Sequence, residues 1–498
     1  MSVALGIDLG TQSIKVFFYD MEARACIALT SAPLELYQTS LGVAEQRADW
    51  WIKGLHNALQ QVEPSIRSGV KVISVSGQQH GFVPIDQKGQ PLVPVKLWCD
   101  TSTNQECDYL TEKLGGHSAC LSDIGNPILP GYTASKLLWF RNNHPKAYAD
   151  MDCILLPHDY INFYLTGEKC MEAGDASGTG FFNIRRREWS EKALTAIDPV
   201  RDLRSCLPPV TKSITTIGTL LPNIAKELGL PEGTPVATGG GDNMMGAIGT
   251  GNVAPGTITM SLGTSGTLYS YADMPVLDRF GQIAAFCSST GGWLPLICTM
   301  NCTVATELVR DLFNADITDF ESMLKASPRG AEGILTVPYF NGERTPNLPN
   351  AKACMFGMDS QNMSPQNFLR SAVEGVCFGL RAALEHLTNQ GIKSDQMILT
   401  GGGANSQIWR QTMSDVCNTP VTVLKNQEAA AFGAALQAIA AMSGESIVTL
   451  TKTHLQTDNA KFCEPQPNAV DFYQNHYQTY ESASAQVAEI YTVDRSQK

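Results

Sequence analysis

The most constraining feature of this 498-residue chain is an internal repeat of two glycine motifs. Leu-Gly-Thr stands between two apolar, strand-like segments at residues 9–11 and again at 262–264. Thr-Gly-Gly-Gly, followed by one variable residue and asparagine, occurs at residues 238–243 and 400–405, each time after a short apolar strand. One glycine turn alone carries little information, but two different motifs in the same order predict a duplicated α/β domain.

The two motifs recur at unequal distances, 253 residues for the first and 162 for the second, which predicts an insertion of about 91 residues in the first copy. The chain length suits two large domains. Glycines gather between residues 246 and 256, so we place the boundary there, with a first domain at 1–249 and a second at 250–498. The cleft between the two copies is the expected ligand site.

The apolar periodicity elsewhere alternates between helix and strand. It predicts helices at residues 50–62, 134–142 and 366–388 and a strand at 71–76. A surface helix is expected at the end of the polar tail that begins at residue 451. This alternation agrees with the α/β class that the repeat predicts.

The composition excludes several classes of protein. A net charge of −12 and a pI near 5.2 argue against a nucleic-acid partner, because binding to a phosphate backbone needs a concentrated basic face. The fourteen cysteines form no CxxC pair, which argues against a zinc module or disulfide framework and fits a reducing compartment. No signal-peptide pattern is present, and the longest apolar run near the C-terminus, at 429–442, is shorter than the roughly 20 residues of a bilayer span. We therefore expect a cytoplasmic protein with a small-molecule ligand and no membrane partner.

The glycine turns suit a phosphate chain, because a Gly-Thr turn between strands points several backbone N–H groups and hydroxyls the same way. One turn from each copy would hold the two sides of a triphosphate. Asp8 ends the first strand where the second copy has Ser261, and a carboxylate facing phosphates needs a divalent cation between them. We therefore expect Asp8 to hold Mg²⁺, directly or through water. The residues predicted to bind the nucleotide are Gly10, Thr11, Gln12, Ser13, Lys15, Gly263, Thr264, Gly402, Gly403, Ala404 and Asn405.

The Thr-Gly-Gly-Gly pair differs at its fifth position. Ala404 leaves room for the backbone of the second copy to lie against a ring such as adenosine. Asp242 replaces it in the first copy, and a carboxylate directed into the same cleft can accept a proton from a substrate hydroxyl that attacks the γ-phosphate. The alternative is that Asp242 caps the following helix, and both roles can coexist.

Six motifs in this order resemble the FGGY carbohydrate kinases, over nearly the whole chain to about residue 440. The resemblance rests on residues 8–11, 77–81, 239–243, 261–265, 342–346 and 401–404, and residues 131–143 are similar to that family's first signature. It implies an α/β fold of two duplicated, actin-like (ribonuclease H-like) ATPase domains with an interdomain cleft, as in the actin, hexokinase and Hsp70 superfamily. The resemblance also implies that catalysis occurs when the domains close, with ATP as co-substrate and Mg²⁺ as cofactor. A homodimer is common among similar kinases.

Within this family, the members that phosphorylate D-xylulose are the nearest likeness. In them, the pair that matches Gln79 and His80 lies against the ketose, and a segment like residues 98–103 supplies an aspartate, here Asp100, to the sugar hydroxyls. Trp98 is either a stacking surface for the sugar or a core tryptophan. The region around Asp159 and Asp175 also resembles the family's, with Glu172-Ala-Gly in place of a more usual acidic, serine-containing stretch.

The expected reaction is transfer of the γ-phosphoryl group of ATP to the terminal hydroxyl of D-xylulose. Asp242 would act as the base and Asp8 would position Mg²⁺. The predicted sugar-binding residues are Gln79, His80, Trp98, Asp100 and Asp242. Two alternatives stay open: a kinase for another substrate, such as ribulose, L-xylulose, glycerol or gluconate, and an actin- or Hsp70-like ATP-driven interaction protein. The segment that carries Gln79, His80 and Asp100 favours a sugar kinase, because a chaperone or filament needs no such polar pocket.

Overall fold

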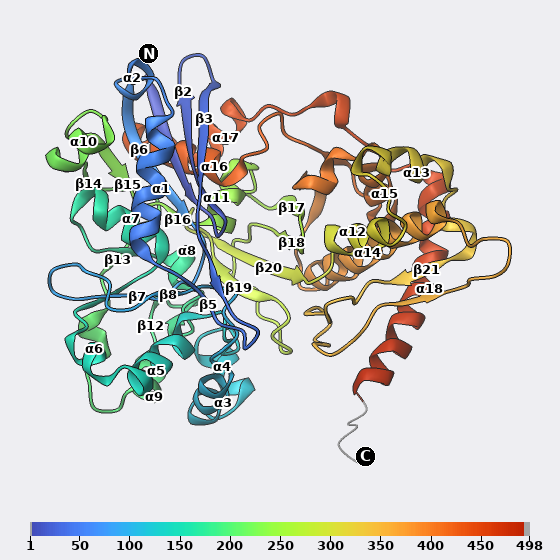
Figure 1. The fold of residues 1–498 in the computed structure, drawn as a ribbon, viewed down its shortest axis with the longest axis horizontal. Coiled ribbons are helices and arrows are strands. Elements are labelled where there is room, and N and C mark those ends of the chain that lie inside the picture. The colour runs from blue at the N-terminus through green and yellow to red at the C-terminus, as the bar shows by residue number, and fades with distance from the viewer. Residues whose placement is uncertain (1, 493–498) are drawn as a thin grey trace.

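The computed structural model describes residues 2–492, which form two lobes, each built on a mixed sheet (Figure 1). The first sheet has the strand order β14-β15-β6-β1-β2-β3, with β16 beside β6. β1 and β2 form an antiparallel hairpin, and β6 runs parallel to β1. The strands are β1 (Val3–Leu9), β2 (Ser13–Asp20), β3 (Ala25–Pro33), β6 (Val70–Gly77), β14 (Thr216–Thr219), β15 (Pro235–Ala237) and β16 (Gly240–Gly241).

The second sheet repeats this arrangement in the order β19-β20-β18-β17-β23-β24. β17 and β18 form the second antiparallel hairpin, and β23 runs parallel to β17 as β6 does to β1. The predicted duplication is therefore confirmed. Its strands are β17 (Gly256–Leu262), β18 (Gly266–Tyr269), β19 (Ala284–Cys287), β20 (Trp293–Thr299), β23 (Ser394–Thr400) and β24 (Val421–Thr422).

The predicted equivalence of the two Thr-Gly-Gly-Gly motifs is wrong. The motif at 238–243 follows β15, which is separated from β1 by β6, whereas the motif at 400–405 follows β23, which lies directly beside β17. The two look alike because each begins with a glycine of positive φ, Gly239 at 73° and Gly401 at 81°, that passes close to a neighbouring strand's carbonyl. The 91-residue insertion deduced from this equivalence is wrong as well.

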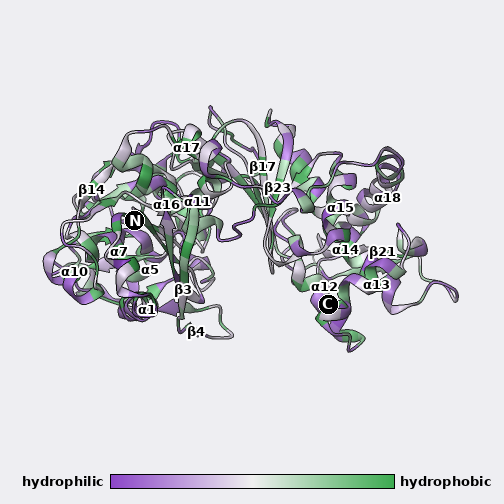
Figure 2. Cartoon of the chain, turned by 90° about the horizontal axis from the view of Figure 1, so that it is seen from above, coloured by the Kyte–Doolittle hydropathy of each residue, from purple (hydrophilic) through white to green (hydrophobic). Residues whose placement is uncertain are grey.

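A helix from the second half of the chain packs on the first sheet. α16 (Ala429–Ser443) lies against β1, β6 and α11 (Asp242–Gly249), and Figures 1 and 2 show it in the lobe that carries the N-terminus. The polar residue in this apolar helix, Gln437, has a structural role. Its buried amide forms hydrogen bonds with the hydroxyl of Ser74 and with the backbone N–H and carbonyl of Gly239. The division of the chain at residue 249 stays a prediction, and Gly246 and Gly249 lie in α11 rather than in a linker.

The other predicted elements are present with small changes at their ends. The predicted helices correspond to α1 (Ala48–Gln60), α5 (Thr133–Asn143) and α14 (Pro365–Thr388), and the predicted strand to β6. The tail ends in α18 (Pro467–Thr492), one face of which is buried through a row that includes Tyr473, Tyr477 and Tyr480. All fourteen cysteines are unpaired. Between residues 2 and 492, no helix is both long enough and apolar enough to cross a lipid bilayer.

The contact between α11 and α16 depends on glycine. A Cβ added to Gly433 would overlap the carbonyl of Met245, so Gly433→Ala should force the helices apart and lower the free energy of unfolding by about 1–3 kcal/mol. The matched control is Gly379→Ala in α14, where a Cβ would come no closer than 3.4 Å to the Tyr480 hydroxyl. Urea unfolding should show a loss for the first variant and no loss for the second, since alanine is the better helix former. Equal midpoints for both variants would contradict this packing.

Candidate active site

The ends of three neighbouring parallel strands bring together the predicted acids of the first half. Asp8 lies near the end of β1, and its Oδ1 accepts a hydrogen bond from the hydroxyl of Ser76 in β6 at 2.8 Å. Gly241 at the end of β16 pairs with Gly77 at the end of β6, and Asp242 then begins α11. Because parallel strands end at one edge of a sheet, Asp8 and Asp242 lie at the same edge.

Asp8 and Asp242 influence each other's charge. Burial raises the pKa of Asp242 to about 7, and the negative charge of Asp8 adds to this rise. Burial also raises the pKa of Asp8, although the hydrogen bond from Ser76 acts in the opposite direction. A carboxylate whose pKa is near neutrality can take up and release a proton at pH 7, which is the property of a general base.

The capping role considered for Asp242 is partly present. The N-cap residue of α11 is Gly241, but Oδ1 of Asp242 accepts hydrogen bonds from the backbone N–H of Asn243 at 2.7 Å and from its side-chain amide at 3.1 Å. Within residues 2–492, nothing bonds Oδ2. The carboxyl group is therefore oriented through one oxygen and can accept a proton through the other.

Asn243 joins the site, although it is not among the predicted site residues. Its Nδ2 donates to Oε1 of Gln79 at 2.7 Å, which ties the start of α11 to the loop after β6. Nε2 of Gln79 is buried and has no partner among the described residues. Leaving a buried amide unpaired costs about 1–3 kcal/mol, and a ligand oxygen would satisfy it. The Asp-Asn sequence at the start of a helix was the signal that could have identified Asn243.

His80 is held as a rigid polar group beside Gln79. Its φ is 62°, a left-handed conformation that non-glycine residues seldom adopt. Its carbonyl accepts hydrogen bonds from Nζ of Lys136 at 2.9 Å and from the hydroxyl of Thr133 at 3.1 Å. Its ring centroid lies 5.1 Å from that of Tyr132 and 5.3 Å from that of Phe286. A strained backbone that is fixed in this way is typical of a functional position.

Trp98 is not a core tryptophan, because 47% of it is exposed. Its Nε1 donates to the hydroxyl of Thr11 at 3.0 Å, and that hydroxyl in turn donates to Oε1 of Gln78 at 3.0 Å. The indole therefore lies beside the first glycine turn, where a sugar could stack on it. The hydroxyl of Thr11, which we predicted to bind phosphate, is instead occupied by protein groups.

The prediction that Asp100 contacts the sugar is corrected by its burial. Asp100 is 0% exposed. Its Oδ2 accepts hydrogen bonds from the N–H of Ala44 at 2.9 Å and from Nζ of Lys96 at 3.1 Å. Its Oδ1 accepts from both the N–H and the hydroxyl of Ser102, at 2.9 and 2.6 Å. Asp100 thus fixes the loop that presents Trp98 and has no oxygen free for a sugar.

The first glycine turn is closed by its own backbone, since the N–H of Gly10 donates to the carbonyl of Ser13 at 3.0 Å. Gln12, between them, is exposed. Lys15, which we predicted to bind phosphate, has its Nζ 2.5 Å from Oε2 of Glu428. This ion pair joins the hairpin of the first half to the residue that precedes α16. Lys15 must exchange that partner before it can bind a phosphate.

The second half contains a cavity of about 620 Å³ at the ends of β17 and β23. Five predicted nucleotide-binding residues line it, namely Gly263, Thr264, Gly402, Gly403 and Asn405. Ala404 is buried instead, and its carbonyl accepts a hydrogen bond from Nη1 of Arg410 at 2.7 Å. The remaining lining was not predicted from the sequence. It comes from α12 (Thr303–Leu312), α13 (Phe320–Ala326) and their neighbours, and includes Thr303, Thr306, Arg310, Ile317, Phe320 and Trp409.

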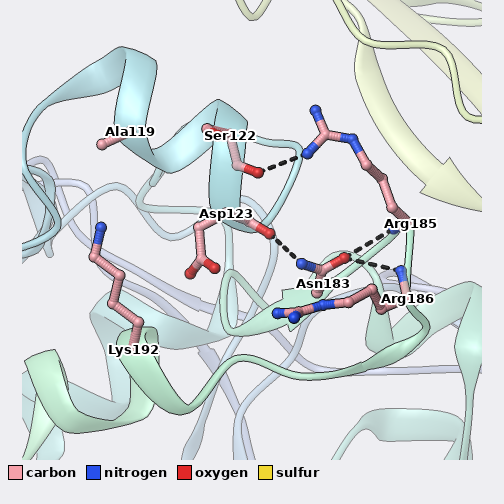
Figure 3. A pocket seen from close by; sticks show the side chains of 7 residues that line it. All are labelled: Ala119, Ser122, Asp123, Asn183, Arg185, Arg186 and Lys192. Atoms are coloured by element: carbon pink, nitrogen blue, oxygen red, sulfur yellow. Dashed lines mark hydrogen bonds between the residues drawn. The ribbon is translucent and has the colours of Figure 1, made fainter.

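A separate cavity of about 490 Å³ lies on the first half, and none of the predicted site residues lines it (Figure 3). Its basic side chains already have partners. Arg185 donates to the carbonyl of Ser122 at 2.6 Å, and Lys192 donates to that of Leu114 at 2.8 Å. The residues predicted to bind sugar and nucleotide are therefore grouped elsewhere, at the strand ends of the two sheets.

Comparisons with known proteins agree with this arrangement. The profile of the N-terminal domain of the FGGY family of carbohydrate kinases matches residues 3–249, and that of the C-terminal domain matches residues 259–442. A protein named xylulose kinase from Haemophilus influenzae is 44% identical over 483 residues, which are 96% of this chain and 98% of that protein. Another xylulose kinase, from Bacillus subtilis, is 36% identical and covers 88% of each chain.

Solved structures show the same fold along the whole chain. The crystal structure of a "xyloylose kinase" from Brucella ovis has a TM-score of 0.91 and 28% sequence identity, and the match covers 98% of this chain and 100% of that one. The matches remove the alternative of an actin- or Hsp70-like interaction protein, because none of the reported relatives is of that kind and both halves match kinase domains. The chain therefore belongs to the FGGY family of carbohydrate kinases and is a sugar kinase.

Proposed function

We propose that the chain transfers the γ-phosphoryl group of ATP to the terminal hydroxyl of D-xylulose, giving D-xylulose 5-phosphate and ADP. The observation that carries the proposal is the position of Asp242, a carboxyl group with a raised pKa and one unbonded oxygen, next to the partly unsatisfied polar pair of Gln79 and Asn243. Relatives named xylulose kinase, similar over nearly the full length, support the choice of sugar.

In the proposed reaction, Asp242 accepts the proton of the sugar hydroxyl while the hydroxyl oxygen forms a bond to the γ-phosphorus. The bond from that phosphorus to the β-phosphate oxygen breaks, and ADP leaves with its electron pair. Gln79, Asn243 and His80 hold the ketose so that its terminal hydroxyl faces Oδ2 of Asp242. Trp98 offers an apolar face for the C–H groups of the sugar.

The acids of the first half fit Mg²⁺ that arrives with ATP. Asp8 and Asp242 are hard oxygen donors that repel each other, and each has a raised pKa. No group of three or more His, Cys, Asp or Glu side chains forms a metal cage among residues 2–492. Mg²⁺ needs none, because it usually binds through one or two carboxylates together with substrate phosphates. Asp8 would hold it, directly or through water, where it would neutralise the charge of the phosphates.

The nucleotide would occupy the cavity of the second half. Its glycine backbone at 402–403 and the rings of Phe320 and Trp409 suit a base and ribose, and the turn at 263–264 suits the phosphates. The γ-phosphate would then point toward Asp242 from the opposite lobe. Assembly into a homodimer and a cytoplasmic location remain predictions.

Replacing the proposed base should abolish most of the turnover. We expect Asp242→Asn to lower kcat by about 10²–10⁴, because the amide cannot accept the proton, while the Kd for ATP changes little. The measurement is coupled ADP release with D-xylulose, together with equilibrium binding of ATP. Asp49→Asn makes the same change in the first turn of α1, where the carboxylate pairs only with Arg47 and Lys53 and bonds no predicted site residue, and should leave both values unchanged. Near-normal turnover of Asp242→Asn would remove Asp242 from the mechanism.

The raised pKa of Asp242 predicts how activity depends on pH. A base must be deprotonated, so kcat/KM for the sugar at saturating MgATP should fall about tenfold per pH unit below a pKa at or under about 7. A cation beside Asp8 shifts this pKa downward, because it offsets the charge that helps to raise it. The residual activity of Asp242→Asn should not show this fall in kcat/KM at low pH. A flat profile between pH 5 and 8 for the unaltered enzyme would contradict the assignment.

The choice of D-xylulose is tested by comparing substrates. ADP release should be measured with D-xylulose, D-ribulose, L-xylulose, glycerol and gluconate, each at a series of concentrations with MgATP. D-xylulose should give the highest kcat/KM, because a site that pairs each hydroxyl rejects analogues with misplaced hydroxyls. A higher value for any other compound would replace D-xylulose as the substrate but leave the family unchanged.

A further inference from the structure

A buried row of four titratable side chains begins at His80 and leads away from the sugar site. Nδ1 of His80 lies 3.5 Å from Oδ1 of Asp175, and Oδ2 of Asp175 lies 3.1 Å from Nδ1 of His158. On its other side, Nε2 of His158 lies 2.9 Å from Oδ1 of Asp159. Each of these residues is at most 7% exposed. The mechanism above uses only His80, so the other three need an explanation.

The backbone around Asp175 is fixed by a further carboxylate. Asp175 lies in the short helix α8 (Ala173–Ala176), and His158 and Asp159 lie in the first turn of α7 (Pro157–Thr166). The two oxygens of Glu172 accept hydrogen bonds from the N–H groups of Gly174 and Asp175, both at 2.8 Å. Gly174 leaves room for the side chain of Glu172, since a Cβ at position 174 would overlap Oε1 of Glu172. The backbone of Asp175 is therefore fixed within α8, and its Oδ1 also accepts a hydrogen bond from the backbone N–H of His80 at 3.4 Å.

His158 carries a positive charge. Burial alone would lower its pKa, but Asp159 and Asp175 raise the pKa of His158 well above its ordinary value. Nδ1 is hydrogen-bonded to Asp175, and Nε2 lies 2.9 Å from Oδ1 of Asp159 in an ion pair that is not aligned as a hydrogen bond, so both carboxylates favour the charged ring. Burial alone would raise the pKa of Asp175, but the hydrogen bonds from His158 and His80 lower it to about 2. Asp175 is therefore a carboxylate with two accepting oxygens.

The charge of Asp175 decides the tautomer of His80. Burial lowers the pKa of His80, so the ring is neutral at pH 7 and carries one proton. Nδ1 is buried and forms no hydrogen bond with the described residues in this conformation, but Oδ1 of Asp175 lies 3.5 Å from it. A proton on Nδ1 would be attracted by this carboxylate, whereas a lone pair there would be repelled by it. The distance of 3.5 Å is long, as hydrogen bonds of this kind often are before substrate binds.

We propose that Asp175, charge-balanced by His158, fixes the orientation and tautomer of His80 so that Nε2 accepts a hydrogen bond from a hydroxyl of the sugar. Asp175 and His158 are thus positioning residues, and His80 selects a hydroxyl over a group that cannot donate. The inference rests on the sugar-kinase function proposed above. A purely structural role, in which the row only joins α7 to α8, makes different predictions.

Kinetics separate the two roles through a double-mutant cycle. Asp175→Asn keeps the shape but can donate to Nδ1, which would move the proton to Nε2. We expect it to lower kcat/KM for the best sugar of the panel at least tenfold, chiefly through KM, with the KM for ATP unchanged. In the His80→Ala background, Asp175→Asn should cause no further loss, because its effect acts through His80. Losses that multiply in the double variant, or a KM for ATP that rises equally, would overturn the proposal.

The tautomer can be observed without any substrate. The chain has eight histidines, so ¹⁵N-histidine labelling gives a small set of ring signals, and His80→Ala and His158→Gln assign the two of interest. At neutral pH, His80 should be neutral with its proton on Nδ1, and His158 should be doubly protonated. A proton on Nε2 of His80, or a neutral His158, would refute the proposal even if Asp175→Asn fails to fold. Because this readout needs no activity, its failure is distinct from failure of the sugar assignment.

Discussion

The rest of the structure depends on the close crossing of α11 and α16. A Cβ on Gly249 would overlap the carbonyl of Ala429, and a Cβ on Gly433 would overlap that of Met245, so the two helices meet backbone to backbone through reciprocal glycines. α11 follows β15 and β16, which lie beside β6, and α16 follows β24, which lies beside β23. The two helices therefore hold equivalent positions in the two halves, and their crossing joins these positions. It also places the start of α11, with Asp242, at the junction of the halves.

The two halves share a scaffold but differ in the charge at their strand ends. The first half presents the acids Asp8 and Asp242, whereas the second presents glycines and the hydroxyl of Thr264 beside an open cavity. In the proposed function, the first half would therefore accept the proton and the second would bind the nucleotide. A protein with a net charge of −12 could hold an anionic nucleotide in this way, because the proposed phosphate site uses backbone N–H groups and a metal ion and does not depend on the overall charge.

Local patterns predicted the local structure well. Alternating apolar residues around Leu-Gly-Thr identified both hairpins, and helical periodicity placed α1, α5 and α14 within a few residues of their ends. The sequence also grouped Asp8, Asp242, Gln79 and His80, because motifs at strand ends meet at one edge. The hairpins and helices depend on contacts between residues close together in the sequence, whereas the grouping at the sheet edge depends on the place of each motif at the end of a parallel strand.

Long-range interactions caused the failures. The two Thr-Gly-Gly-Gly motifs share a first glycine of positive φ but not a position in the sheet, and neither motif specifies the order of the strands. From the sequence, Asp100 resembles a sugar-binding aspartate. In the fold, its carboxylate oxygens accept hydrogen bonds from Ala44, Lys96 and Ser102 instead. The hydroxyl of Thr11 is lost to Trp98 for the same reason. A residue's type determines which hydrogen bonds it can form, whereas the fold determines which partners lie within bonding distance.

The charges at the junction also bear on when the base becomes active. Asp242 begins a helix, where the dipole lowers the pKa of a carboxyl group, yet its pKa is raised because burial and Asp8 outweigh that effect. Without nucleotide, a pKa near 7 leaves much of Asp242 protonated at neutral pH. Positive charge placed beside Asp8 lowers the pKa of Asp242 and favours its deprotonated form. If the nucleotide brings Mg²⁺ to Asp8 as proposed, the deprotonated base forms fully only when the second substrate is in place. This single pair of carboxylates would then couple proton acceptance to nucleotide binding.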